Sequence, residues 1–301
     1  MGAAEKIELP KMTYDFILNK LEELPTLPAI VGEINNLVND PMSTTKEILD
    51  VMEKDQSLTT KILKLVNSGY YAIPGGVKSL ERAITLLGFE QVRTLVISTS
   101  VFNNLKVVPP DGFDIKKFWQ HSIGVAMTAE TIAKHVQHKA PHELFTGGLV
   151  HDMGKIALLK ISPEIPKQLA VYARANNMAY VDAEDQFDTV KHAMVGHMLA
   201  QKWKLPVNLQ GAIRYHHHVA IDTRMALSVE MNQFLDIIIF AKMFIHFINF
   251  GDSGHSMRSR SPDDLNTRLH VSGENVKEIS LKVQKALDNA NSFMEIIGGA
   301  D

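Results

Sequence analysis

The sequence is organised around the stretch Gly147-Gly148-Leu149-Val150-His151-Asp152-Met153-Gly154-Lys155-Ile156-Ala157-Leu158-Leu159. It places an adjacent histidine and aspartate, and then a lysine, inside an apolar run. Polar side chains in such a run are costly to bury unless something pairs with them. A divalent metal ion would pair with His151 and Asp152 and leave Lys155 beside it as a phosphate contact. The alternative is a satisfied polar pair at a helix end, and the other histidines bear on that choice.

Composition limits the kind of protein and the kind of metal site. The chain has 301 residues, of which 45% are hydrophobic and 22% charged, as in an ordinary globular protein of one large or two modest domains. It has no cysteine, so any metal ion must be held by histidine and carboxylate. The formal net charge is -3 and there is no basic block, so we expect neither nucleic acid nor an anionic membrane as a partner.

No segment of the sequence has the features of a signal peptide or a membrane span. Met1–Lys6 does not lead into an apolar run. The most apolar segment, Leu235–Phe250, is interrupted by Asp236, Lys242 and His246, and it is shorter than the roughly 20 residues that a span needs. We expect a buried core helix there and a cytoplasmic protein.

The hydrophobic periodicity predicts an all-α fold. Thr44 and Glu47 form a plausible capping box at one helix start. The segment Val96–Val101 is rich in β-branched residues and resembles a strand, but no second strand candidate lies near it, so we predict a helix there as well. In the second half the expected helices are 116–136, 144–159, 165–176, 182–203, 207–217, 227–250 and, after a Gly/Ser/Arg loop at 251–261, 274–297.

Histidine usage and one proline-rich segment divide the chain. Val107-Val108-Pro109-Pro110-Asp111-Gly112 is the clearest internal boundary. The first 120 residues contain none of the 13 histidines, whereas residues 121–218 contain ten. We therefore predict an N-terminal helical subdomain (1–112), a helical subdomain with the metal site (113–250), and a C-terminal loop and helix that pack on the core (251–301).

The candidate metal ligands are far apart in sequence, so only a fold can bring them together. Inward-facing residues from several helices of a bundle can converge on one core site. Neutral imidazoles with a carboxylate suit Fe, Mn, Ni or Zn, and the carboxylate can bridge two ions. We predict one or two divalent ions, with Asp152 as the bridge, held by His121, His151, Asp152, His192, His216 and His217.

These residues carry a resemblance to a known family. The order His, His-Asp, His and a His pair resembles the HD superfamily of metal-dependent phosphohydrolases and, within it, the HD-GYP cyclic-dinucleotide phosphodiesterases. The chain is more similar to the HDOD family (HD-related output domain) over about residues 20 to 250. The motifs that carry this second resemblance are Leu24-Pro25-Thr26-Leu27-Pro28, Asp55-Gln56-Ser57-Leu58, Leu65-Val66-Asn67-Ser68, Ala83-Ile84-Thr85-Leu86-Leu87-Gly88, His192-Ala193-Met194-Val195-Gly196 and Trp203-Lys204-Leu205-Pro206.

Two departures from the enzyme families bear on catalysis. HD-GYP enzymes have a glycine-tyrosine-proline loop after the histidine pair, and here His218 to Asp222 stand instead. HD enzymes also have a final aspartate ligand on a late helix, and Lys242 occupies the matching place. A lysine beside a divalent cation loses Coulomb energy and removes an acceptor. Asp236 could substitute as the ligand, but it lies six residues earlier, at another height and face of the helix.

Three functions are open. The resemblance to the HDOD family implies a signalling or regulatory output protein with an HD-like helical bundle and a protein partner, and the two departures above favour lost phosphohydrolase activity. The retained ligand set leaves open a metal-dependent phosphohydrolase of nucleotides or cyclic dinucleotides, in which Lys155 would contact a phosphate oxygen. A di-iron redox sensor or oxygenase would use the same ligands.

Overall fold

Every regular element of the described chain, residues 9–40 and 42–298 of a computed structural model, is a helix. This confirms the predicted all-α fold. The front helices are α1 (Tyr14–Glu22), α2 (Ala29–Asn39), α3 (Thr45–Met52), α4 (Gln56–Val66), α5 (Leu80–Leu87) and α6 (Phe89–Asn104).

The front helices begin and end where local chemistry dictates. Thr44 and Glu47 form the expected capping box at the start of α3. The β-branched segment Val96–Val101 is helical and lies in α6, whose residues are buried almost without interruption. Helix α6 belongs to the core although its buried residues include the polar Gln91 and Arg93, and it packs against α2, α4, α5 and α8.

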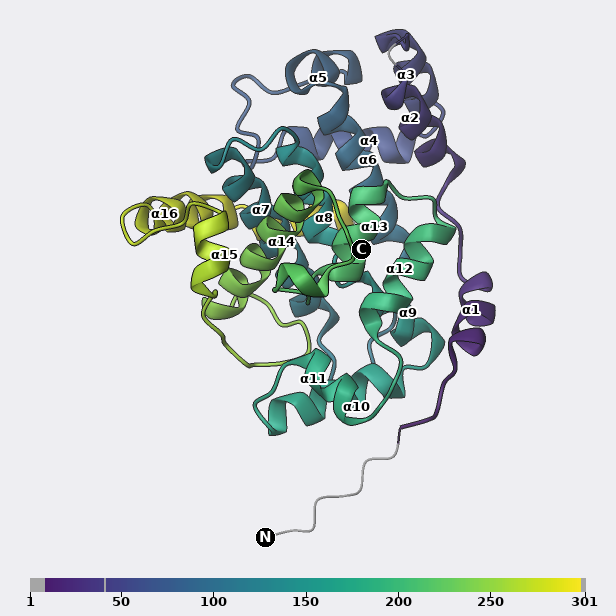
Figure 1. The fold of residues 1–301 in the computed structure, drawn as a ribbon. Helices are drawn as coiled ribbons and strands as arrows, with labels where there is room; N and C mark the ends of the chain where they lie inside the picture. The colour runs from purple at the N-terminus through teal and green to yellow at the C-terminus, as the bar shows by residue number, and fades with distance from the viewer. Residues whose placement is uncertain (1–8, 41, 299–301) are drawn as a thin grey trace.

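The longest helix, α7, runs through the middle of the second half and packs against α8, α14 and α16 (Figure 1). None of the helices in the described segments is long and apolar enough to cross a bilayer. The remaining elements are α7 (Ile115–His135), α8 (Pro141–Val150), α9 (Met153–Ile161), α10 (Glu164–Ala175), α11 (Tyr180–Gln186), α12 (His192–Lys202), α13 (Val207–Tyr215), the 3₁₀ turn η1 (Ile221–Thr223), α14 (Val229–Phe247), α15 (Asp263–Arg268), α16 (Val276–Leu287) and α17 (Ala290–Gly298).

Three helices that we predicted as continuous are each two helices. The predicted helix 144–159 breaks at His151-Asp152, between α8 and α9. The predicted helix 182–203 breaks between α11 and α12, where Asp188 has a φ of 46°. A residue in this left-handed conformation ends a helix, and aspartate adopts it more readily than most residues other than glycine. The predicted helix 274–297 breaks at Asp288-Asn289, between α16 and α17.

The C-terminal helices pack back onto the rest of the molecule. Helix α16 lies against α7, and α17 contacts α4, α6 and α7. The ring of Phe293 on α17 packs edge-on against Phe145 at 5.3 Å and against Tyr70 at 6.0 Å between ring centroids. One hydrophobic core therefore includes residues of the front, middle and C-terminal parts.

A buried carboxylate ties the front helices to α7. Glu130 on α7 is 1% exposed and accepts hydrogen bonds from Tyr70, from Lys134 at 2.9 Å and from His142 at 2.8 Å. Burial alone would raise the pKa of Glu130, but these three partners together hold it below its usual value. The carboxylate thus contributes stability that is present above its unfolded pKa and is lost as pH falls through the lower folded pKa.

We expect Glu130→Gln to lower the free energy of unfolding at pH 7 by about 1–3 kcal/mol, because it removes a charge-assisted acceptor from a buried network. The difference from the parent should narrow as the pH falls below about 4.3, the ordinary pKa of glutamate in the unfolded chain, toward the lower pKa of folded Glu130. Urea unfolding between pH 3 and 7 measures both effects. Glu23→Gln, at an exposed ion pair with Lys20, is the matched control and should change stability little. An equal, pH-independent loss in the two variants would contradict this assignment.

Candidate metal centre

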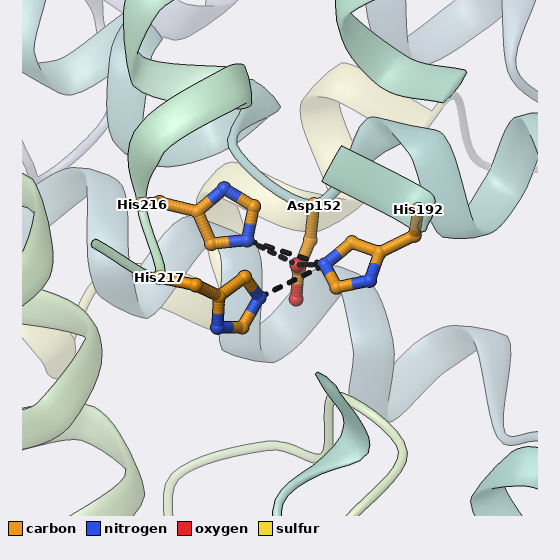
Figure 2. A group of neighbouring side chains, drawn as sticks. All are labelled: Asp152, His192, His216 and His217. Atoms are coloured by element: carbon orange, nitrogen blue, oxygen red, sulfur yellow. Dashed lines mark hydrogen bonds and ion pairs between the residues drawn. The ribbon is translucent and has the colours of Figure 1, made fainter. Parts of the chain in front are cut away.

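The break between α8 and α9 places His151 and Asp152 outside both helices, so that their side chains point into the bundle. His192 begins α12, and His216 and His217 follow the last turn of α13. His121 lies in the middle of α7. All six predicted ligands come together, and Figure 2 shows Asp152, His192, His216 and His217 pointing at one another. Five of the six are fully buried, with His217 at the edge.

Four of these residues form a tight cluster, which we call the Asp152 cluster (Asp152, His192, His216, His217). Oδ1 of Asp152 lies 3.1 Å from Nε2 of His192 and 3.2 Å from Nε2 of His216. The Nε2 atom of His192 lies 3.2 Å from that of His216 and 3.1 Å from that of His217. Ligand atoms about 2.1 Å from one metal ion lie about 3.0 Å apart in an octahedron and about 3.4 Å apart in a tetrahedron. The observed spacings fall in that range.

The hydrogen bonds of the Nδ1 atoms determine which Nε2 atoms face the middle of the Asp152 cluster as acceptors. Nδ1 of His192 donates to Oε1 of Glu184 at 2.8 Å, and Nδ1 of His216 donates to the carbonyl of Ile213 at 2.8 Å. In the neutral imidazole the proton therefore sits on Nδ1, and the lone pair of Nε2 points inward. Two lone pairs and the carboxylate of Asp152 repel one another unless a cation lies between them.

Unpartnered atoms support the same conclusion. Oδ1 of Asp152 and Nε2 of His151 and of His121 have no hydrogen-bond partner among residues 9–40 and 42–298. Buried acceptors of this kind are uncommon in stable proteins, because each costs about 1–3 kcal/mol. A proton on His192 could satisfy only one of its neighbours at a time. The donor set therefore fits a divalent metal ion.

A second group, His121, His151 and Asp152, adjoins the first through the shared aspartate. Nδ1 of His151 donates to the carbonyl of Gly148 at 2.7 Å, so its Nε2 lone pair also faces inward, 3.4 Å from Oδ2 of Asp152. However, Nζ of Lys155 lies closer to Oδ2, at 2.7 Å, and also donates to the carbonyl of Ser253 at 2.9 Å. A cation thus already occupies the Asp152 oxygen that a second metal ion would use.

Lys242 stands beside the histidine pair. Its Nζ donates to the carbonyl of His216 at 2.9 Å and lies 3.1 Å from Nδ1 of His217. When Lys242 donates, neutral His217 carries its proton on Nε2, unlike His192 and His216. Burial lowers the pKa of Lys242 to about 7, and the nearby Asp152 opposes that shift. The availability of His217 as a ligand is therefore linked to this lysine.

The buried setting keeps most of the histidines neutral, which is the form that binds metals. Burial holds the pKa values of His121, His216 and His217 well below the usual range. Burial also lowers the pKa of His192, but the charge of Glu184 and the hydrogen bonds with Asp152 and Glu184 together outweigh it, and the net shift is upward. For Asp152, burial acts to raise the pKa, yet Lys155 and His151 hold it well below its usual value.

Asp236 does not replace the missing ligand. It is buried on α14 and bound by two arginines: Nη2 of Arg224 at 2.6 Å and Nε of Arg268 at 2.7 Å. Both of its oxygens are used by this ion pair, so the carboxylate joins the 218–224 segment to α15. Its role is structural.

Sequence reasoning missed three residues of the site. Glu184 on α11 is fully buried and orients His192, but it lies outside every recognised motif. His246 and His255 stack on each other with ring centroids 4.2 Å apart, and His246 also lies 4.5 Å from His121. The expected loop at 251–261 carries His255 and is anchored where the amide of Asp252 donates to the carbonyl of Lys117.

Comparison with known proteins supports the family inferred from the motifs. The HDOD domain model matches residues 24–219, which confirms the HDOD resemblance. An uncharacterized protein of Treponema pallidum (strain Nichols) is 24% identical over 246 residues, which are 81% of this chain. The chain spans about half of that relative, 46% of its length.

Solved structures share the fold. An HDOD domain protein of unknown function from Geobacter sulfurreducens has a TM-score of 0.75 at 23% identity and covers 94% of this chain and 99% of its own. A candidate phosphohydrolase from Shewanella amazonensis SB2B has a TM-score of 0.70 at 23% identity, covering 92% and 98%. A candidate signal transduction protein from Marinobacter aquaeolei VT8 has a TM-score of 0.70 at 20% identity, covering 97% and 62%.

Proposed function

Because the chain belongs to the HDOD domain family, we propose that it is a signalling protein whose helical core holds one divalent metal ion and does not hydrolyse phosphate esters. The ion is held by Asp152, His192 and His216, with His217 as a fourth ligand that depends on Lys242. The retained ligand set and its inward lone pairs support the metal. The signalling role rests on the family, and the relative from Marinobacter aquaeolei, named as a candidate signal transduction protein, agrees with it.

The proposed loss of hydrolysis rests on one observation. Lys242 donates to the histidine pair from the place where HD enzymes have an acidic ligand. A bound divalent ion would supply Lewis acidity toward a phosphate oxygen. Hydrolysis by two ions needs both groups of ligands, and here the ammonium of Lys155 holds Oδ2 of Asp152. The positive charge of Lys155 and the absence of an acidic side chain at position 242 both disfavour a second ion.

The second candidate function is a metal-dependent phosphohydrolase or phosphodiesterase acting on nucleotides or cyclic dinucleotides. The complete set of His121, His151, Asp152, His192 and the histidine pair favours it. Lys155 would have to leave Asp152 to contact a substrate phosphate. A di-iron redox sensor would need both groups of ligands loaded with iron and would absorb visible light in a way that changes on reduction.

Turnover separates these functions. We expect purified protein supplied in turn with Mn²⁺, Fe²⁺, Ni²⁺ and Zn²⁺ to release no more phosphate from phenyl phosphate or AMP than the Asp152→Ala variant does. It should likewise leave cyclic di-GMP intact. Phosphate release assays and chromatography of the nucleotides measure this. Hydrolysis that disappears in Asp152→Ala would overturn the proposal and establish the second candidate. A signalling role further requires a protein partner, which we propose without assigning the surface that binds it.

A further inference from the structure

A two-part cleft lies between α14 and the segment 253–266, and His217 of the Asp152 cluster lines its inner part. The inner pocket has a volume of about 170 Å³. Four polar side chains that could meet a ligand line it, those of His217, Lys242, His246 and His255, together with apolar ones that include Val219 and Ile239. The outer pocket has a volume of about 360 Å³ and is lined mainly by apolar side chains. Met243 and Ser259 line both pockets, so the two adjoin each other.

We propose that this cleft binds a phosphate monoester with one apolar or aromatic group, its phosphate in the inner pocket and that group in the outer one. The inference rests on the proposed function, because such a ligand would be the signal that the metal-bearing core senses.

The inner pocket suits a small dianion. Lys242 lines it with an amine that donates in either protonation state, and the ring nitrogens of His246 and His255 can donate as well. Ser253 is close enough to His246 for a hydrogen bond, 3.2 Å between Oγ and Nε2, while Nδ1 of His255 has no partner in the described part of the chain. No acidic side chain lines this pocket among the described residues. Its volume of about 170 Å³ is enough for a phosphate group.

The outer pocket suits an apolar group of limited size. Phe240, Phe244, Phe247 and Val276 form its apolar wall, and the rings of Phe240 and Phe244 stack with an interplanar angle of 23°. Arg260 and Asp263 stand at its rim and can take polar substituents. Its volume lies at the lower end of the range of small-ligand pockets, about 300–1,000 Å³. It has room for a single ring or nucleoside-sized group.

The test is isothermal titration calorimetry of the metal-loaded protein with three probes: inorganic phosphate, phenyl phosphate and benzoate. We expect phenyl phosphate to bind at least tenfold more tightly than either of the others, since only it fills both pockets. Lys242→Met should weaken the binding of phenyl phosphate at least tenfold. Metal content measured on the same sample verifies that this variant keeps its ion.

Two tryptophan substitutions test the outer pocket without touching the metal ligands. Ser259 and Ser256 are both exposed and lie in the same segment, but only Ser259 lines the cleft. Ser259→Trp should reduce the binding of phenyl phosphate to that of inorganic phosphate, whereas Ser256→Trp should leave it unchanged.

The proposal would be overturned if phenyl phosphate bound no more tightly than inorganic phosphate. It would also be overturned if phenyl phosphate bound equally tightly to the two tryptophan variants. Benzoate that binds as tightly as phenyl phosphate would overturn the choice of a phosphate head. Phosphate release during the titration would instead refute the proposed loss of hydrolysis while leaving the ligand assignment intact. The two proposals therefore fail separately.

Discussion

Gly154→Ala should destabilise the protein by about 3 kcal/mol or more, because it forces helix backbones apart beside the metal site. Helix α9 crosses α12 with Gly154 against Gly196. A Cβ atom on Gly154 would overlap the carbonyl of His192 and lie 2.7 Å from the amide nitrogen of Gly196. Since His192 begins α12, the required shift also moves a proposed metal ligand. Denaturant unfolding and metal content together measure the effect.

Gly32→Ala is the matched control for this substitution. Gly32 lies within α2, and a Cβ atom there would meet no heavy atom within 4 Å. Alanine should therefore stabilise the helix by about 0.5–1 kcal/mol. Changes of opposite sign in the free energy of unfolding of the two variants would support the close crossing of α9 and α12. Similar free energies of unfolding would contradict it.

Lys155→Met should have a second large effect, which a divalent metal ion reverses. Lys155 is buried and neutralises Asp152 on the side of His151, and its ammonium also lies 4.5 Å from the ring centre of Tyr180. Removing one member of a buried charge pair costs about 3–5 kcal/mol. In the variant, Oδ2 of Asp152 becomes free to bind a cation together with His121 and His151.

We therefore expect Lys155→Met to be less stable than the parent in EDTA, to regain stability with added Mn²⁺, and to bind nearly two ions per chain. Thermal unfolding with and without metal, and metal analysis after desalting, measure these changes. Lys167→Met, at a surface pair with Glu164, should behave as the parent does. The view that this lysine displaces a second ion would be refuted if Lys155→Met bound one ion and gained no more stability from added metal than the parent does.

The sequence was sufficient to predict the helical fold and the six residues that converge, because their motifs are specific and their burial follows from apolar periodicity. The breaks at His151-Asp152 and before His192 were not predictable in the same way. Neither contains glycine or proline, and the second depends on Asp188 adopting a left-handed conformation. Tertiary packing overrides local helix propensity at both places.

The supporting residues could not be predicted because nothing in their neighbourhood marks them. Glu184 resembles an ordinary helix glutamate, and only the approach of α11 to α12 shows that it accepts hydrogen bonds from both the backbone amide and Nδ1 of His192. His255 lies in a Gly/Ser/Arg segment that suggested a mobile loop.

The most direct test of the account is metal analysis of the purified protein beside His192→Ala and His121→Ala. We predict about one divalent ion per chain in the parent, loss of that ion in His192→Ala, and its retention in His121→Ala, with all three proteins folded by circular dichroism. A parent without metal would contradict the central claim. So would a parent with two ions, or an ion lost in His121→Ala and kept in His192→Ala.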